Sequence, residues 1–189
     1  MSDAVSALGG AVYQGFATIS DAGPSGMITL RGDLAASKLR KAVKSATGVD
    51  LPDRNRVRFA DGKGVCWMSP DELLILCDYA GAGALVARLS EALGGVHHLV
   101  ANVSDARARI TIRGSDLREV LAKLTPADVS PAAMQPGQFR RSRLAQVPAA
   151  FWMADESTVE VICFRSVARY VFDILRSAAT PGSEVGFFD

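Results

Sequence analysis

The sequence predicts an α+β fold that consists of two tandem copies of one βαββαβ unit. The first observation is an internal repeat: "MITLRG" at residues 27–32 returns as "RITIRG" at residues 109–114. The second is an apolar pattern of helical period after each copy, and the third is a matching series of β-prone runs and a closing helical pattern. Two blocks of about 80 residues therefore share one order of elements.

The repeated phrase is itself the first predicted strand of each unit, because Ile-Thr-Leu and Ile-Thr-Ile are strongly β-prone. Each strand ends in Arg-Gly, where glycine permits a tight exit toward a helix. Asp33 in the first copy, and Ser115 or Asp116 in the second, are suitable helix N-caps. Glu119 stands three residues after Asp116 and predicts a capping box.

Apolar residues at helical spacing follow each cap, and each stripe predicts a helix that covers a sheet. The stripes are Ala35, Leu39, Ala42, Val43 and Ala46 in the first copy, and Leu117, Val120, Leu121 and Leu124 in the second. A second helical stripe closes each block. These stripes are Leu85, Val86, Leu89 and Leu93, and then Val167, Val171, Ile174, Leu175 and Ala178.

Between the two helices of each block the sequence predicts strands joined by turns. The predicted strands are 57–59, 65–68 and 73–77 in the first block, and 143–147, 150–153 and 158–164 in the second. "ADGKG" has the turn chemistry of a tight hairpin. A segment rich in Pro and Ala, residues 126–138, predicts a surface loop.

This order of elements is the split βαβ, or ferredoxin-like, arrangement, in which helices pack on an antiparallel sheet. Two such units in tandem predict pseudo-twofold symmetry. We expect an N-terminal arm at 1–16, a first repeat at 17–102, a second repeat at 103–180 and a C-terminal tail at 181–189. The strand within residues 93–105 leads from one repeat to the next, and the two repeats are expected to form one compact domain.

Composition describes an ordinary globular protein. The chain has 189 residues, 49% of them hydrophobic, and a net charge of +1, so a strongly basic nucleic-acid binder is disfavoured. The first residues have no basic region before an apolar run, and no stretch of about 18 apolar residues could span a membrane. We therefore expect a cytoplasmic protein with neither nucleic acid nor membrane as a partner. Cys66, Cys77 and Cys163 form no C-x-x-C pair and are expected to be buried, reduced thiols.

The sequence predicts no catalytic, cofactor-binding or metal-binding residue in this chain. It has no G-x-S-x-G, P-loop or G-x-G-x-x-G motif. His97 and His98 are adjacent in a predicted strand, so their side chains point to opposite faces and cannot bind one metal together.

Three arginine clusters and the C-terminal tail are the candidate contact surfaces. The clusters are Arg54, Arg56 and Arg58; Arg107 and Arg109; and Arg140, Arg141 and Arg143. Alternate arginines on one strand could grip a carboxylate ligand or an acidic partner, or they could protect a sheet edge from aggregation. Phe187 and Phe188 follow a Pro-Gly break, where exposed aromatic rings would need a partner chain to cover them. The predicted partner contacts are Arg140, Arg141, Arg143, Phe187 and Phe188.

Several phrases of the sequence resemble the gamma subunit of heterotetrameric sarcosine oxidase. They are "NVSDARARITIRGSDLREVLAKLTPADVSPAAM", "RRSRLAQVPAAFWM" and "VEVICFRSVARYVFDILR". The resemblance covers nearly the whole chain and is strongest over residues 100–176. It implies a fold similar to the folate-binding domain of the glycine-cleavage aminomethyltransferase. It also implies a flavoenzyme that oxidises sarcosine with oxygen in the presence of tetrahydrofolate, which gives glycine, methylenetetrahydrofolate and hydrogen peroxide.

The same resemblance implies no cofactor in this chain. In that family FAD and the substrate site belong to the beta subunit, FMN to the alpha and beta boundary, NAD and the folate domain to alpha, and zinc to delta. The implied partners are the alpha, beta and delta subunits, mainly alpha. The family offers no catalytic residue of gamma that matches a position here.

Two other functions stay open. A stand-alone folate-binding or one-carbon-transfer module would use the arginine clusters for the glutamyl carboxylates, although the aminomethyltransferases have additional C-terminal domains. An accessory factor that binds RNA or serves iron-sulfur enzymes is disfavoured by the net charge of +1. It is also disfavoured because "KGVCWMSPDE" has an extra valine and lacks the second glycine and the glutamine of the Lys-Gly-Cys-x-x-Gly-Gln-Glu motif.

Overall fold

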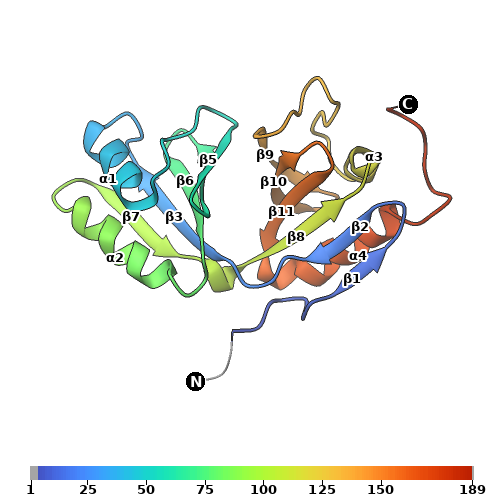
Figure 1. Cartoon of the computed structure of the whole chain (residues 1–189), viewed down its shortest axis with the longest axis horizontal. Helices are drawn as coiled ribbons and strands as arrows, with labels where there is room; N and C mark the ends of the chain where they lie inside the picture. The colour runs from blue at the N-terminus through green and yellow to red at the C-terminus, as the bar shows by residue number, and fades with distance from the viewer. Residues whose placement is uncertain (1–3, 189) are drawn as a thin grey trace. The chain divides into compact units, whose positions relative to one another are not determined.

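Both copies of the repeated phrase form inner strands of antiparallel sheets in the computed structural model, which describes residues 4–188 (Figure 1). The first copy lies in β3 (Gly26–Gly32) and the second in β8 (Arg107–Arg113). The chain divides into two compact units, one made of residues 25–105 and the other of residues up to Pro24 together with those from Ala106 onward. The predicted α+β class with antiparallel sheets is confirmed.

The unit of residues 25–105 contains five strands and two helices. In spatial order the strands are β4 (Val57–Ala60), β5 (Lys63–Ser69), β6 (Glu72–Cys77), β3 and β7 (His98–Asn102), and the helices are α1 (Ser37–Thr47) and α2 (Ala82–Ala92). Without the edge strand β4, the order β5-β6-β3-β7 is that of the ferredoxin-like arrangement. Asp61 (φ 47°) and Gly62 (φ 74°) form the two-residue turn between β4 and β5, so the predicted hairpin is confirmed.

One face of this sheet is covered by its helices, because alternate strand residues and the helical stripes are apolar. Ile28 and Leu30 of β3 are fully buried against Leu39 and Val43 of α1 and Leu89 of α2. α1 begins at Ser37 rather than at Asp33, whose carboxylate accepts the N–H of Ala35 (2.9 Å) in the preceding turn. Ala35, which was predicted to belong to the apolar stripe, is consequently exposed and lies outside the buried face of α1.

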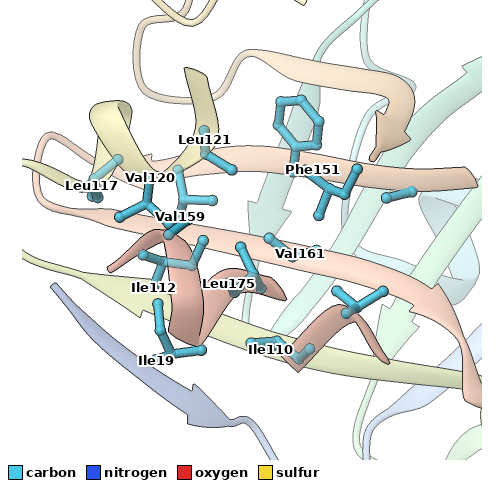
Figure 2. Packing of buried hydrophobic residues seen from close by; sticks show 14 of the residues in the cluster. Ile19, Ile110, Ile112, Leu117, Val120, Leu121, Phe151, Val159, Val161 and Leu175 are labelled. Carbon is cyan, nitrogen blue, oxygen red and sulfur yellow. The ribbon is translucent and has the colours of Figure 1, made fainter. Parts of the chain in front are cut away.

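In the part of the other unit that the structure describes, six strands lie in the order β1-β2-β8-β11-β10-β9. Its further elements are β1 (Val12–Gln14), β2 (Thr18–Asp21), α3 (Leu117–Ala122), β9 (Phe139–Leu144), β10 (Val147–Asp155), β11 (Thr158–Phe164) and α4 (Ala168–Ala178), with a 3-10 turn at Arg165–Val167. A further 3-10 turn, Ser104–Ala106, spans the point in the chain where the units divide. Figure 2 shows the core, in which α3 and α4 pack on the sheet. The labelled core residues are Ile19, Ile110, Ile112, Leu117, Val120, Leu121, Phe151, Val159, Val161 and Leu175.

The strand that precedes each copy of the repeated phrase in the chain lies in the sheet that contains the other copy. β7 directly precedes β8 in the chain, yet it pairs with β3, with Leu30 opposite Val100. β2 directly precedes β3, yet it pairs with β8, with Ile19 opposite Ile112. Among the described residues no strand follows α4, and β2 takes the place beside β8 where the predicted last strand of the second repeat would lie.

The division of the chain therefore differs from the expected ranges 1–16, 17–102 and 103–180. Residues 12–14 of the expected arm form a strand that pairs with β2, and residues 18–21 of the expected first repeat belong to the sheet of β8. The boundaries fall at 24/25 and 105/106 because backbone hydrogen bonding groups these segments by sheet and not by sequence. No helix among residues 4–188 is long and apolar enough to cross a membrane.

Candidate functional site

The C-terminal tail runs from the end of α4 past α3 (Figure 1). Its two aromatic residues differ in burial: Phe188 is half-buried and packs against the core, whereas Phe187 is 73% exposed. The two rings meet edge to face with their centroids 4.9 Å apart. The structure thus places one of the predicted contact residues against its own unit and leaves the other facing solvent.

Glu119 of α3 fixes the backbone of this tail. Its carboxylate accepts hydrogen bonds from the N–H of Phe187 (2.8 Å) and of Val185 (2.9 Å), and the residue is only 7% exposed. These backbone N–H groups, with that of Phe187 contributing most, lower the pKa of Glu119 below its ordinary value. The predicted capping box with Asp116 is wrong, because the Asp116 side chain makes no cap and the Glu119 carboxylate faces the tail.

Lys123 lies one turn after Glu119 and holds a second part of the same segment. Its Nζ donates to the backbone carbonyl of Ala178 (3.0 Å) at the end of α4 and to the backbone carbonyl and hydroxyl of Ser183. The ammonium also lies 4.8 Å from the ring centroid of Phe16. α3 therefore joins the last helix to the tail through two oppositely charged side chains.

A groove of about 420 Å³ opens between the tail and the loop that follows α3. We call it the tail groove, and its lining residues are Glu119, Ala122, Lys123, Thr125, Pro126, Ala127, Asp128, Val129, Val185, Phe187 and Phe188. Most of these side chains are apolar, and the charged groups of Glu119 and Lys123 are engaged with the tail itself. Asp128 is exposed, and the N–H of Ser130 lowers the pKa of its carboxyl group.

Arg118 holds the predicted surface loop at 126–138 by hydrogen bonds to its backbone. This residue is 7% exposed, and its Nη1 donates to the carbonyls of Val129 (2.7 Å) and Met134 (2.9 Å). Val129 and Met134 are themselves buried. The loop is therefore a defined wall of the tail groove.

The predicted contact residues on β9 fall into two environments. Arg140 is half-buried, and its guanidinium donates to the carbonyl of Ala133 and to Oε1 of Gln138 (2.8 Å). Arg141 and Arg143 are exposed on the same edge strand of the sheet. Arg140 thus donates hydrogen bonds to the loop at 126–138 of its own chain, while Arg141 and Arg143 are exposed.

Neighbouring carboxylates partly balance the positive charge of the other two arginine clusters. Arg58 pairs with Asp53 at 2.9 Å, and both side chains are largely exposed. Arg109 lies 3.3 Å from Glu160, whose pKa is raised because burial outweighs the attraction of that arginine. Arg107 lies over the ring of Phe164, 5.6 Å from its centroid. None of the arginines in these two clusters lines the tail groove.

The cysteines and histidines show no catalytic arrangement in the described part of the chain. Burial raises the pKa of Cys163 to about 11 and raises that of Cys77, so both thiols are protonated at neutral pH and are poor nucleophiles. Nδ1 of His98 lies 2.8 Å from the carbonyl oxygen of Val96. Within residues 4–188 no three His, Cys, Asp or Glu side chains are close enough to hold a metal ion.

Sequence reasoning missed the roles of Glu119, Lys123 and Arg118. Glu119 and Lys123 have the i,i+4 spacing of a surface pair, and their real partners lie 55–68 residues away. The one available signal was that Glu119 and Arg118 stand within an apolar helical segment, where a charged residue requires partners.

Comparison with known proteins gives concordant results. Residues 31–181 match the model of the family described as "Sarcosine oxidase, gamma subunit family". A sarcosine oxidase subunit gamma from Arthrobacter sp is 32% identical over 123 residues, which cover 64% of this chain and 60% of that protein. The match therefore spans less than two thirds of that relative's length.

Two solved structures have a similar fold. A chain of the heterotetrameric sarcosine oxidase from Corynebacterium sp. U-96, in complex with pyrrole 2-carboxylate, has a TM-score of 0.79 at 26% identity, over 86% of this chain and 83% of that chain. Aminomethyltransferase T of the glycine cleavage system from Bartonella henselae has a TM-score of 0.60 at 16% identity, over 83% of this chain and 45% of that chain. The second similarity shows the fold alone.

Proposed function

Since the chain belongs to the sarcosine oxidase gamma subunit family, we propose that it is a non-catalytic subunit of a heterotetrameric, flavin-dependent and tetrahydrofolate-linked sarcosine oxidase. The observation that carries this proposal is the family match over residues 31–181. The fold similarity to a chain of the Corynebacterium enzyme supports it independently.

The proposed complex converts sarcosine, tetrahydrofolate and oxygen to glycine, methylenetetrahydrofolate and hydrogen peroxide. In it this chain associates with alpha, beta and delta subunits, mainly with alpha, in the cytoplasm. FAD, FMN, NAD, zinc and tetrahydrofolate are bound by those partners and not by this chain. The role of this chain is to support assembly of the complex.

The chemistry of the described side chains agrees with a structural role. Arg118, Glu119 and Arg140, which could otherwise act on a ligand, make hydrogen bonds to backbone groups of their own chain. The buried thiol of Cys163 has a pKa of about 11, far from the value that a nucleophile at neutral pH requires. The tail groove is mostly apolar and has the character of a contact surface.

Coexpression tests the proposal. The chain is produced with and without the alpha, beta and delta subunits, and each preparation is assayed for sarcosine-dependent peroxide formation and for flavin absorbance. We expect the chain to copurify with the large flavoprotein subunit, and to lack both flavin and turnover when purified alone. Bound flavin together with turnover by the isolated chain would contradict the proposal.

Calorimetric titration with tetrahydrofolate separates this role from that of a stand-alone folate-binding or one-carbon-transfer module. The isolated chain is expected to give no binding heat and no increase in melting temperature at saturating ligand. A Kd in the micromolar range with a matching increase in melting temperature would favour the folate-binding module instead.

A further inference from the structure

The tail exposes two large apolar side chains in close succession. Val185 is 70% exposed and Phe187 is 73% exposed, the highest values among the large hydrophobic residues described. Single exposed apolar residues are common, but these two lie on the rim of an apolar groove of about 420 Å³. A patch of this kind is typical of a protein interaction site.

The backbone that presents these side chains is already ordered in the free chain. Glu119 accepts the N–H groups of Val185 and Phe187, Lys123 binds Ser183, and Gly186 (φ 64°) allows the turn between the two bonded residues. A partner would therefore meet Phe187 in a fixed position. Binding costs less conformational entropy when the contact segment is preorganised.

The charges around the tail groove indicate the kind of partner. Asp128 lines the groove and is exposed, and Glu184 is exposed on the tail beside Val185. The carboxylate of Glu119 and the ammonium of Lys123 are both bonded to the tail, so the exposed carboxylates of Asp128 and Glu184 set the charge of the rim. The rim is therefore acidic around an apolar centre, which complements a surface with an apolar side chain bordered by Arg or Lys.

We propose that the tail groove, with Val185 and Phe187 on its rim, is the docking site for a partner subunit of the complex, which inserts an apolar side chain flanked by basic residues. This inference rests on the proposed function, since it requires that the chain assembles with other subunits. The family match ends at residue 181 and assigns no role to the tail.

The decisive experiment compares variants in the coexpressed, full-length complex. The double variant Val185→Ala/Phe187→Ala removes exposed side chains only, so the fold of the chain is expected to persist. We expect its affinity for the other subunits, measured by size-exclusion chromatography and biolayer interferometry, to fall by about 30-fold. Phe59→Ala is the matched control, because Phe59 is 54% exposed in the other unit, and its affinity is expected to be unchanged.

Two further variants test the acidic rim and the preorganised tail. Asp128→Lys should slow association and reverse the effect of added salt on the association rate. Glu119→Gln keeps Val185 and Phe187 but removes the carboxylate that fixes them, and an intermediate loss of affinity is expected. Circular dichroism of each free chain establishes that the variants fold.

The outcomes separate the two proposals. If the wild-type chain does not assemble with the other subunits, the proposed function fails. If the wild-type chain assembles and the double variant assembles with equal affinity, the docking site is wrong and the proposed function stands. Self-association of the free wild-type chain that the double variant abolishes, with subunit affinity unchanged, would assign the groove to a second copy and would also overturn the docking site.

Discussion

At the scale of single residues, the charges in and around α3 organise the unit that contains β8. Arg118 and Glu119 are each 7% exposed, and every such buried charge must be compensated by hydrogen bonds. Arg118 satisfies the carbonyls of the loop after α3, and Glu119 satisfies the N–H groups of the tail. Adjacent residues of one short helix therefore fix two irregular segments on either side of the tail groove.

Replacing Arg118 by Met should destabilise the chain by about 2–4 kcal/mol, because the carbonyls of Val129 and Met134 would lose a charged donor while remaining buried. Urea unfolding monitored by circular dichroism measures this change. Arg169→Met is the matched control: Arg169 is 72% exposed and pairs with Asp173 on the surface of α4, so a change within about 0.5 kcal/mol is expected. Equal losses in the two variants would show that the loop does not depend on Arg118.

The tail should detach from α3 at acidic pH. The pKa of Glu119 is lowered by the N–H groups of Phe187 and Val185, so this contact contributes stability above the ordinary value of 4.5 and loses it as pH falls through the lowered pKa. NMR titration of the Val185 and Phe187 amides from about pH 7 to about pH 3 follows the release. We expect a midpoint below 4.5 that is absent in Glu119→Gln; a midpoint at or above 4.5 would contradict this assignment.

At the scale of secondary-structure elements, β2 is the segment whose position matters most. It lies in the first 24 residues, yet Ile19 is fully buried in the core with Ile112 of β8 and Leu175 of α4. A strand precedes each copy of the Ile-Thr strand in the chain, and each of these preceding strands pairs with the other copy. β7 belongs to the same contiguous unit as β3, whereas β2 joins β8 from the other end of the chain.

Ile19→Ala should therefore weaken the unit that contains β8 and leave the unit of residues 25–105 intact. The expected cost is about 2–4 kcal/mol, because a fully buried side chain leaves a cavity. Hydrogen exchange should show lost protection in β8 and β11 and unchanged protection in β3 and β6. Val12→Ala, at a residue that is 59% exposed on β1, is the control with no such loss. Lost protection in β3 with β8 unchanged would disprove the assignment of β2.

At the scale of the whole molecule, the chain passes between its two units twice, near residues 24 and 105. One unit is continuous in sequence, and the other is assembled from both ends of the chain. Both units nevertheless have one order of four neighbouring strands, β7-β3-β6-β5 in one unit and β2-β8-β11-β10 in the other. The duplication visible in the sequence therefore becomes two equivalent sheets that are not two contiguous halves.

A circular permutant tests this organisation. Joining the termini by a flexible linker of about 20 residues and opening the chain between Gly23 and Pro24 makes both units continuous. We expect a folded protein with native-like circular dichroism and thermal unfolding. A second permutant, opened between Ile28 and Thr29 inside β3, interrupts the ladder with β6 and β7 and should not fold. If both permutants fail to the same degree, residues up to Pro24 and those from Ala106 onward do not form a unit that tolerates this connection.

The sequence by itself determined the local elements and the family. Helical spacing predicted the buried faces of α1 and α4, β-prone runs predicted the strands, and Asp61-Gly62 predicted its turn, because these features depend on residues close together in the chain. The quoted phrases also led to the sarcosine oxidase gamma subunit family, which the match over residues 31–181 confirms.

Only the tertiary structure decided which strand lies beside β8 and where the charges of α3 are satisfied. The ferredoxin-like arrangement predicted β7 beside β3, but it also predicted a last strand after the final helix of the second repeat. No local pattern shows that β2, from the start of the chain, takes that place beside β8. Likewise, Glu119 fits a capping box as well as it fits a tail 66–68 residues away. The neighbour of β8 depends on long-range strand pairing, and the partners of Glu119 depend on how its buried charge is compensated. The free energies of both depend on contacts between residues far apart in the chain, which a local sequence pattern does not contain.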